Sequence, residues 1–76
     1  MTLNELANTL KQMYETAPGG EQVAMIHLFG IKYAEEIKAA GYAPKDIVQA
    51  AEMQPSYATE VNKGMKLAAY VTVKNL

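Results

Sequence analysis

The sequence contains no cysteine and no arginine, and it has only one histidine and one serine. Without cysteine the chain has neither a disulfide nor a thiolate metal site, so its stability must come from packing or from a second chain. Catalysis is also disfavoured, because no nucleophile can be paired with a base and no phosphate-binding loop is present. We therefore predict a protein that is not an enzyme, with no cofactor and no small-molecule substrate.

Long hydrophobic runs are missing as well. The longest, residues 23–31, is too short to span a bilayer and is expected to be buried in protein. The first residues, MTLNELAN, are polar and acidic where a secretory signal is basic and then apolar, so we expect a cytoplasmic protein. A chain of 76 residues predicts one small domain over residues 1–76, and a domain of this size is only marginally stable alone.

The sequence predicts an all-α fold of four helices. Thr2 and Glu5 have the spacing of a capping box at the start of the first helix, and Pro18-Gly19-Gly20 ends that helix. The second helix is expected over residues 21–40, with Gly41 as the left-handed residue after its end. Gly30, inside that helix, costs about 1 kcal/mol relative to alanine, which predicts a close crossing of two backbones there.

Two shorter helices are expected to follow, each opened by a proline. Pro44 suits the first turn of the third helix and Pro55 suits the first turn of the fourth. The fourth helix has apolar residues at spacings of three and four. Residues 70–73, Tyr-Val-Thr-Val, alternate as a strand would, but no second strand is evident, so a short extended C-terminal tail is expected. This tail is read as a frayed end, a strand that pairs with a symmetry mate, or the start of a longer protein.

Apolar residues on the first two helices suggest a dimer. In the first helix they recur at the spacings of a coiled-coil seam, and the first half of the second helix is apolar nearly all the way round. Alternatively, the two stripes face each other within one chain. The predicted dimer interface consists of Leu3, Leu6, Leu10, Met25, Leu28 and Phe29.

Neither the histidine nor the acidic residues predict a metal site. His27 lies in the apolar run and is expected to be a packed or partly exposed structural residue. Glu35 and Glu36 are adjacent on a helix and point about 100° apart, so they cannot converge on one ion.

Residues 45–66 have the order of a helix-turn-helix, which is a short helix, a tight turn and a second helix whose outer face enters a major groove. This order would place Ser56, Tyr57, Thr59, Glu60 and Lys63 nearest the groove. Helix-turn-helix families usually have glycine at the start of the turn, where the backbone is left-handed, whereas this chain has Glu52. Because glutamate tolerates that conformation poorly, a longer turn or a different helix angle is expected.

The stretch GYAPKDIVQAAEMQPSYATEVNKGMKLAAYV, residues 41–71, resembles the helix-turn-helix-like small domains of bacterial proteins, which include short regulators and domains of DNA-processing enzymes. The resemblance implies an all-helical fold and contact with double-stranded DNA. The contacts that it implies are Ser56, Thr59, Asn62, Lys63 and Lys66.

The charges of the chain are compatible with DNA contact at one end but fall short of the dense basic patch of a strong electrostatic binder, so charge alone leaves the question open. The net charge is −1, but residues 53–76 hold one glutamate against three lysines. If Lys45, Lys63, Lys66 and Lys74 contact phosphates, the salt slope for one protomer would be about −3.6. Glu60 would repel phosphate, and the lack of arginine removes the usual reader of guanine. The sequence thus predicts a DNA-associated regulatory or accessory domain that acts as a homodimer, or alternatively a protein-protein interaction module that binds no nucleic acid.

Overall fold

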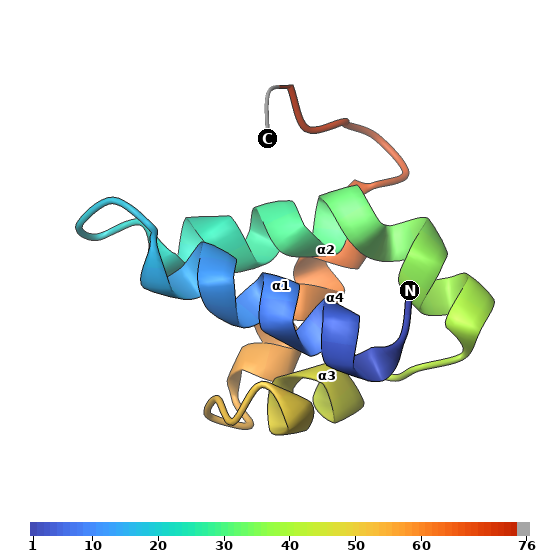
Figure 1. The fold of residues 1–76 in the computed structure, drawn as a ribbon. Helices are drawn as coiled ribbons and strands as arrows, with labels where there is room; N and C mark the ends of the chain where they lie inside the picture. The colour runs from blue at the N-terminus through green and yellow to red at the C-terminus, as the bar shows by residue number, and fades with distance from the viewer. Residues whose placement is uncertain (75–76) are drawn as a thin grey trace.

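The computed structural model describes residues 1–74, and these residues fold as four α-helices joined by short turns (Figure 1). The helices are α1 (Leu3–Glu15), α2 (Gln22–Ala40), α3 (Pro44–Ala50) and α4 (Tyr57–Leu67). The predicted all-α fold with a C-terminal helix pair is confirmed.

Local signals in the sequence set the beginnings and ends of the first helices. Thr2 Oγ1 accepts a hydrogen bond from the Glu5 backbone N–H at 3.1 Å, and the Glu5 carboxylate accepts one from the Thr2 N–H at 2.8 Å. This is the predicted capping box, which satisfies two backbone donors of the first turn of α1. After the C-terminal end of α2, Gly41 has φ 78°, the left-handed conformation that was predicted for it.

The four helices bury one hydrophobic core. It contains residues from every helix, and the α2 and α4 surfaces form its broadest contact. The largest fully buried side chains are Phe29, Leu6, Leu10, Ile26, Ile37, Ile47, Val48 and Val61. Because α1 lies against both α2 and α3, its apolar stripe faces the chain's own core.

The core therefore corrects part of the predicted dimer interface. Leu6, Leu10 and Phe29 are each 0% exposed, so the prediction that they contact a second chain is wrong. Their stripes face each other within one chain, which was the alternative reading of the same spacing. The other members of that set are half-buried and stay a prediction: Leu3, Met25 and Leu28.

α2 and α4 cross at two glycines, with no side chain between the backbones. A Cβ atom on Gly30 would lie 2.5 Å from the carbonyl oxygen of Val61 and 2.9 Å from the Cα of Gly64. A Cβ on Gly64 would in turn collide with the carbonyl oxygen of His27. The close crossing predicted at Gly30 is confirmed, and Gly64 is its unpredicted counterpart.

After α4 the chain turns and runs as an extended tail. The Tyr70 and Val71 backbone N–H groups both donate to the carbonyl of Leu67, at 2.9 and 3.1 Å. The tail then passes along α2 on the side of the molecule away from α3 (Figure 1). Residues 70–73 form no strand within the described part of the chain, because no partner strand lies beside them.

Candidate nucleic-acid interface

The connection between α3 and α4 spans residues 51–56, and its second residue is left-handed. Glu52 has φ 58°, and its N–H donates to the carbonyl of Gln49 at 3.0 Å. The next N–H, that of Met53, donates to the carbonyl of Val48 at 3.1 Å. These two bonds make a Schellman motif, the helix ending that usually places glycine where this chain has Glu52. The glutamate therefore does adopt the conformation that the helix-turn-helix pattern requires.

The turn is longer than the three or four residues of a standard helix-turn-helix. After Met53, a tight turn at Pro55 and Ser56 leads into α4, with bonds of 3.0 Å from Tyr57 N to Gln54 O and 3.1 Å from Ala58 N to Pro55 O. The longer turn follows the sequence expectation. Pro55 thus lies in this turn, two residues before α4, and not within the first turn of the helix.

The outer face of α4 is a polar stripe. Val61, Gly64 and Met65 are buried against α2 and α3. The opposite side chains recur at spacings of three and four, so they share one face, and all of them are exposed. We call this set the α4 outer face; its members are Thr59, Asn62, Lys63 and Lys66.

Tyr57 belongs to the packing of the helix pair and not to its outer face. Its hydroxyl lies 3.1 Å from the hydroxyl of Tyr14 on α1, and the two rings are 5.4 Å apart at their centroids. The hydrogen bond with Tyr14 raises the pKa of Tyr57, because it stabilises the protonated phenol. Since its side chain is turned towards α1, Tyr57 is removed from the predicted groove-facing set.

Ser56 and Lys45 flank the α4 outer face at different distances along the chain. Ser56 is exposed directly before α4, and its side chain makes no capping bond to the helix. Lys45 is exposed in the first turn of α3, whereas the connection to α4 follows the C-terminal end of that helix. The structure therefore places Ser56 next to the outer face, and Lys45 stays a prediction as an exposed cation of α3.

The carboxylate of Glu60 forms a hydrogen bond with a histidine of α2. His27 Nε2 lies 2.7 Å from Glu60 Oε1, and Lys63 Nζ lies 3.4 Å from Glu60 Oε2. An ionised carboxylate only accepts hydrogen bonds, so His27 Nε2 carries the proton. The bond from His27, helped by the charge of Lys63, holds the pKa of the Glu60 carboxyl below its ordinary value. The acid that was expected to repel phosphate thus keeps its charge, which Lys63 offsets in part.

This His27–Glu60 contact could not be predicted from the sequence, since the two residues are 33 positions apart.

Within residues 1–74, no three histidine, aspartate or glutamate side chains gather as a metal-binding group. Over the same residues, none of the helices has both the length and the apolar content needed to cross a bilayer.

The fold and the helix pair define a helix-turn-helix-like all-α domain. A family model described as HTH-like domain matches residues 2–74, nearly the whole sequence, so the chain belongs to the HTH-like domain family. The match includes the first two helices, which lie outside the resemblance seen in residues 41–71. No curated protein and no solved structure matches the chain significantly.

Proposed function

We propose that this HTH-like domain binds double-stranded DNA through the α4 outer face and acts as a homodimer in a regulatory or accessory role. The observation that carries the proposal is the division of α4 into two sides. One side is fixed against α2 and α3, and the other presents Lys63 and Lys66 with the hydrogen-bonding groups of Thr59 and Asn62. Such a helix can lay amide and hydroxyl groups along base edges while its ammonium groups contact phosphates.

The state of Glu60 supports this proposal. A carboxylate that stood free on α4 would oppose the approach of phosphate, whereas here it is bonded to His27 and lies near Lys63. Glu60 keeps its negative charge, but Lys63 and Lys66 outnumber it, so the summed charge on and beside this face is positive. Because arginine is absent, the usual reader of guanine is missing and only lysine could take its place, so we expect modest sequence preference and strong dependence on salt.

The proposal is tested by fluorescence anisotropy with a labelled duplex of mixed sequence. Binding should appear at micromolar protein in low salt, and the logarithm of the binding constant should fall linearly with the logarithm of salt concentration. For one protomer that contacts phosphates through Lys63 and Lys66 alone the slope would be about −1.8, and it would reach about −3.6 if Lys45 and Lys74 also contacted phosphates; a dimer that engages both copies would give up to twice either value. A duplex that shows no salt-sensitive binding under these conditions would refute DNA binding.

A protein-protein interaction module is the second candidate, and exposed apolar side chains near the C-terminus favour it. Tyr70 is 85% exposed, and Val71 and Leu67 are 46% and 42% exposed. A single exposed apolar residue is ordinary, but neighbouring ones suggest a surface that a partner covers. A chain that binds no DNA but self-associates through these residues would support this second function.

A further inference from the structure

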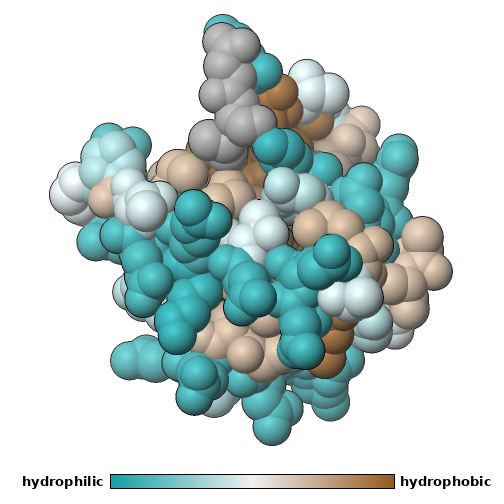
Figure 2. All heavy atoms as spheres, viewed as in Figure 1, coloured by the Kyte–Doolittle hydropathy of each residue, from teal (hydrophilic) through white to brown (hydrophobic). Residues whose placement is uncertain are grey.

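Glu60 lies in the first turn of α4, one position after Thr59 of the α4 outer face. In a helix-turn-helix, the N-terminal residues of the second helix contact the base edges in the major groove. A duplex that receives α4 therefore meets the carboxylate of Glu60 close to its bases. Hydrophilic character alone does not distinguish such a face, because Figure 2 shows a mostly hydrophilic surface over α1 as well. The contribution of α4 depends on what each of its side chains can bind.

The two oxygens of this carboxylate have different neighbours. Glu60 Oε1 accepts a bond from His27 Nε2 at 2.7 Å. Within residues 1–74, the partner of Oε2 is Lys63 Nζ at 3.4 Å, which is longer than the about 2.7–2.9 Å that is usual between charged groups. A carboxylate oxygen has two acceptor sites, so Oε2 keeps the capacity to accept a further hydrogen bond.

Oε2 lies on the solvent side of the pair of helices. Its neighbour Lys63 is 59% exposed and belongs to the α4 outer face, whereas Oε1 faces His27 on α2. The Glu60 side chain as a whole keeps 22% of its surface exposed. His27 thus holds one oxygen against α2, and the other is directed towards the surface that a duplex would meet.

Few groups of DNA can donate to a carboxylate. The hydrogen bond from His27 lowers the pKa of Glu60, so this side chain is ionised at neutral pH and only accepts. In the major groove the donors are the N4 amino group of cytosine and the N6 amino group of adenine. The adenine N6 stands between two acceptors, its own N7 and the O4 of thymine, whereas the cytosine N4 has one acceptor beside it, the O6 of guanine. A second negative group beside the donor repels a carboxylate, so cytosine suits Oε2 best.

We infer that Glu60 reads cytosine in the major groove, with Oε2 accepting a bond from the N4 amino group and His27 acting as a positioning residue for the carboxylate. The inference rests on the proposed DNA binding and names the base that α4 prefers. The preference arises mainly from the cost of the wrong base. A duplex that covers Glu60 without an amino group at this place leaves a desolvated charge with no donor from the DNA.

Three alternating duplexes of equal length test the inference by fluorescence anisotropy: guanine–cytosine, inosine–cytosine and adenine–thymine. The inosine–cytosine pair has the major-groove edge of a guanine–cytosine pair. Because it lacks the N2 amino group of guanine, it has the minor-groove pattern of an adenine–thymine pair. The wild-type chain should bind both cytosine duplexes about five- to tenfold more tightly than the adenine–thymine duplex, the low end of what one good base contact supplies.

Variants assign this preference to its residues. Glu60→Gln should lower the ratio of affinities to about one or below, because glutamine suits the adenine edge. Glu35→Gln removes the same charge from an exposed position of α2 and should leave the ratio at its wild-type value. His27→Ala should lower the ratio, since the carboxylate loses the donor that orients it, and His27→Gln, whose amide can donate, should restore it in part. Circular dichroism of each variant confirms that it remains folded.

Equal binding of the three duplexes, or a wild-type ratio in Glu60→Gln, would overturn the reading of cytosine and leave DNA binding intact. An inosine–cytosine duplex that binds only as well as adenine–thymine would do the same, because it would place the preference in the minor groove. A wild-type ratio in His27→Ala would overturn the positioning role. A chain that binds none of the three duplexes would refute DNA binding itself, and the inference with it.

Discussion

His27 Nε2 donates a hydrogen bond of 2.7 Å to Glu60 Oε1, and this bond joins α2 to α4 beside the crossing of the two helices. The side chains are 32% and 22% exposed, so water screens the pair only in part. The bond determines where the acid of α4 lies relative to the lysines of the outer face.

The first prediction concerns pH. Because the pKa of Glu60 is lowered in the folded chain, its contribution to stability is present above the unfolded value near 4.5 and is lost as the pH falls through the lower folded value. Glu60→Gln should therefore be less stable at pH 7 and should lose less stability on acidification. Urea unfolding between pH 7 and pH 3 measures both effects. Glu35→Gln, which changes an exposed acid of α2, is the control. If the free energy of unfolding falls equally between pH 7 and pH 3 in wild type and Glu60→Gln, the prediction is contradicted.

The second prediction concerns the crossing of α2 and α4. Gly30→Ala places a methyl group 2.5 Å from the carbonyl oxygen of Val61, which is backbone and cannot move aside cheaply. Overpacking of this kind costs about 1–3 kcal/mol, more than the gain of up to about 1 kcal/mol in helix propensity. Thermal unfolding should show a clear loss of stability. A Cβ on Gly19 meets nothing within 4 Å, so Gly19→Ala should leave the melting temperature nearly unchanged. If Gly30→Ala also left it unchanged, α2 and α4 could move apart without loss of stability.

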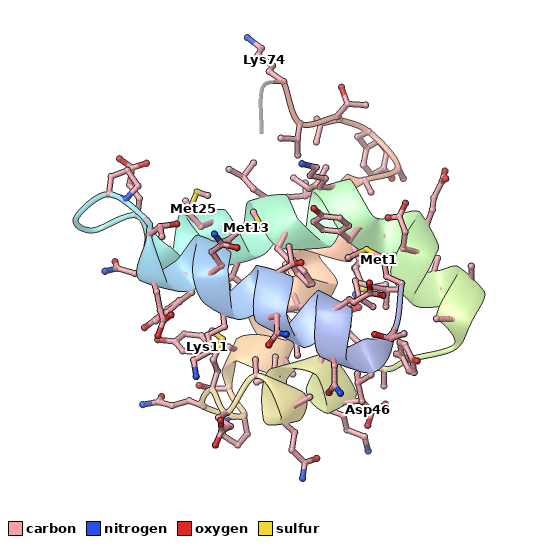
Figure 3. The ribbon with its side chains drawn as sticks, viewed as in Figure 1. Met1, Lys11, Met13, Met25, Asp46 and Lys74 are labelled. Carbon is pink, nitrogen blue, oxygen red and sulfur yellow. The ribbon has the colours of Figure 1, made fainter. Side chains whose placement is uncertain are left out.

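The third prediction concerns the left-handed residue of the turn. Glu52 is 84% exposed in its side chain, and its nearest cation, Lys11 Nζ, is 4.0 Å away, so little packing or charge is lost when it is replaced. Figure 3 shows Lys11 on the side of α1 that faces the turn. Glycine relieves about 1–2 kcal/mol of backbone strain but makes the unfolded chain more flexible. Glu52→Gly should raise the free energy of unfolding by about 0.5–1 kcal/mol in urea titrations, whereas Glu52→Val should lower it. A destabilised glycine variant would mean that the glutamate side chain contributes a contact of its own.

The fourth prediction separates phosphate contacts from base contacts. Lys63→Ala and Lys66→Ala should each weaken DNA binding evenly across sequences and make the salt slope less steep by about 0.9. Asn62→Ala and Thr59→Ala should leave the slope unchanged and alter the preference among duplexes. Lys38→Ala, on α2, controls for general loss of positive charge. If Lys38→Ala has the same effect as the α4 lysine changes, the outer face of α4 is not where DNA binds.

Residues that act within one or two turns of their own helix were predictable. The capping box of Thr2 and Glu5, the left-handed Gly41 and the proline at the start of α3 all depend on local geometry, which a sequence displays directly. Gly30 was also readable, because glycine inside a long apolar helix needs a reason.

Contacts between distant segments were not predictable from one sequence. Spacing shows that Leu6 and Leu10 share a face of α1, but it does not show whether α2 or a second chain covers that face. Tyr57 has the spacing of a groove-facing residue, yet its partner Tyr14 lies 43 positions earlier. Periodicity identifies the faces of a helix, and only the tertiary arrangement assigns each face its neighbour.

The paired glycines at the helix crossing have a consequence for the length of any DNA site. Because the α2 and α4 backbones touch directly at Gly30 and Gly64, the angle between these helices has little freedom. In any dimer, each α4 would therefore be held in one fixed position relative to the α2 of its own chain. The spacing of two half-sites on a duplex, which must match the helical repeat of about 10 base pairs, would then depend in part on two residues of the helix crossing.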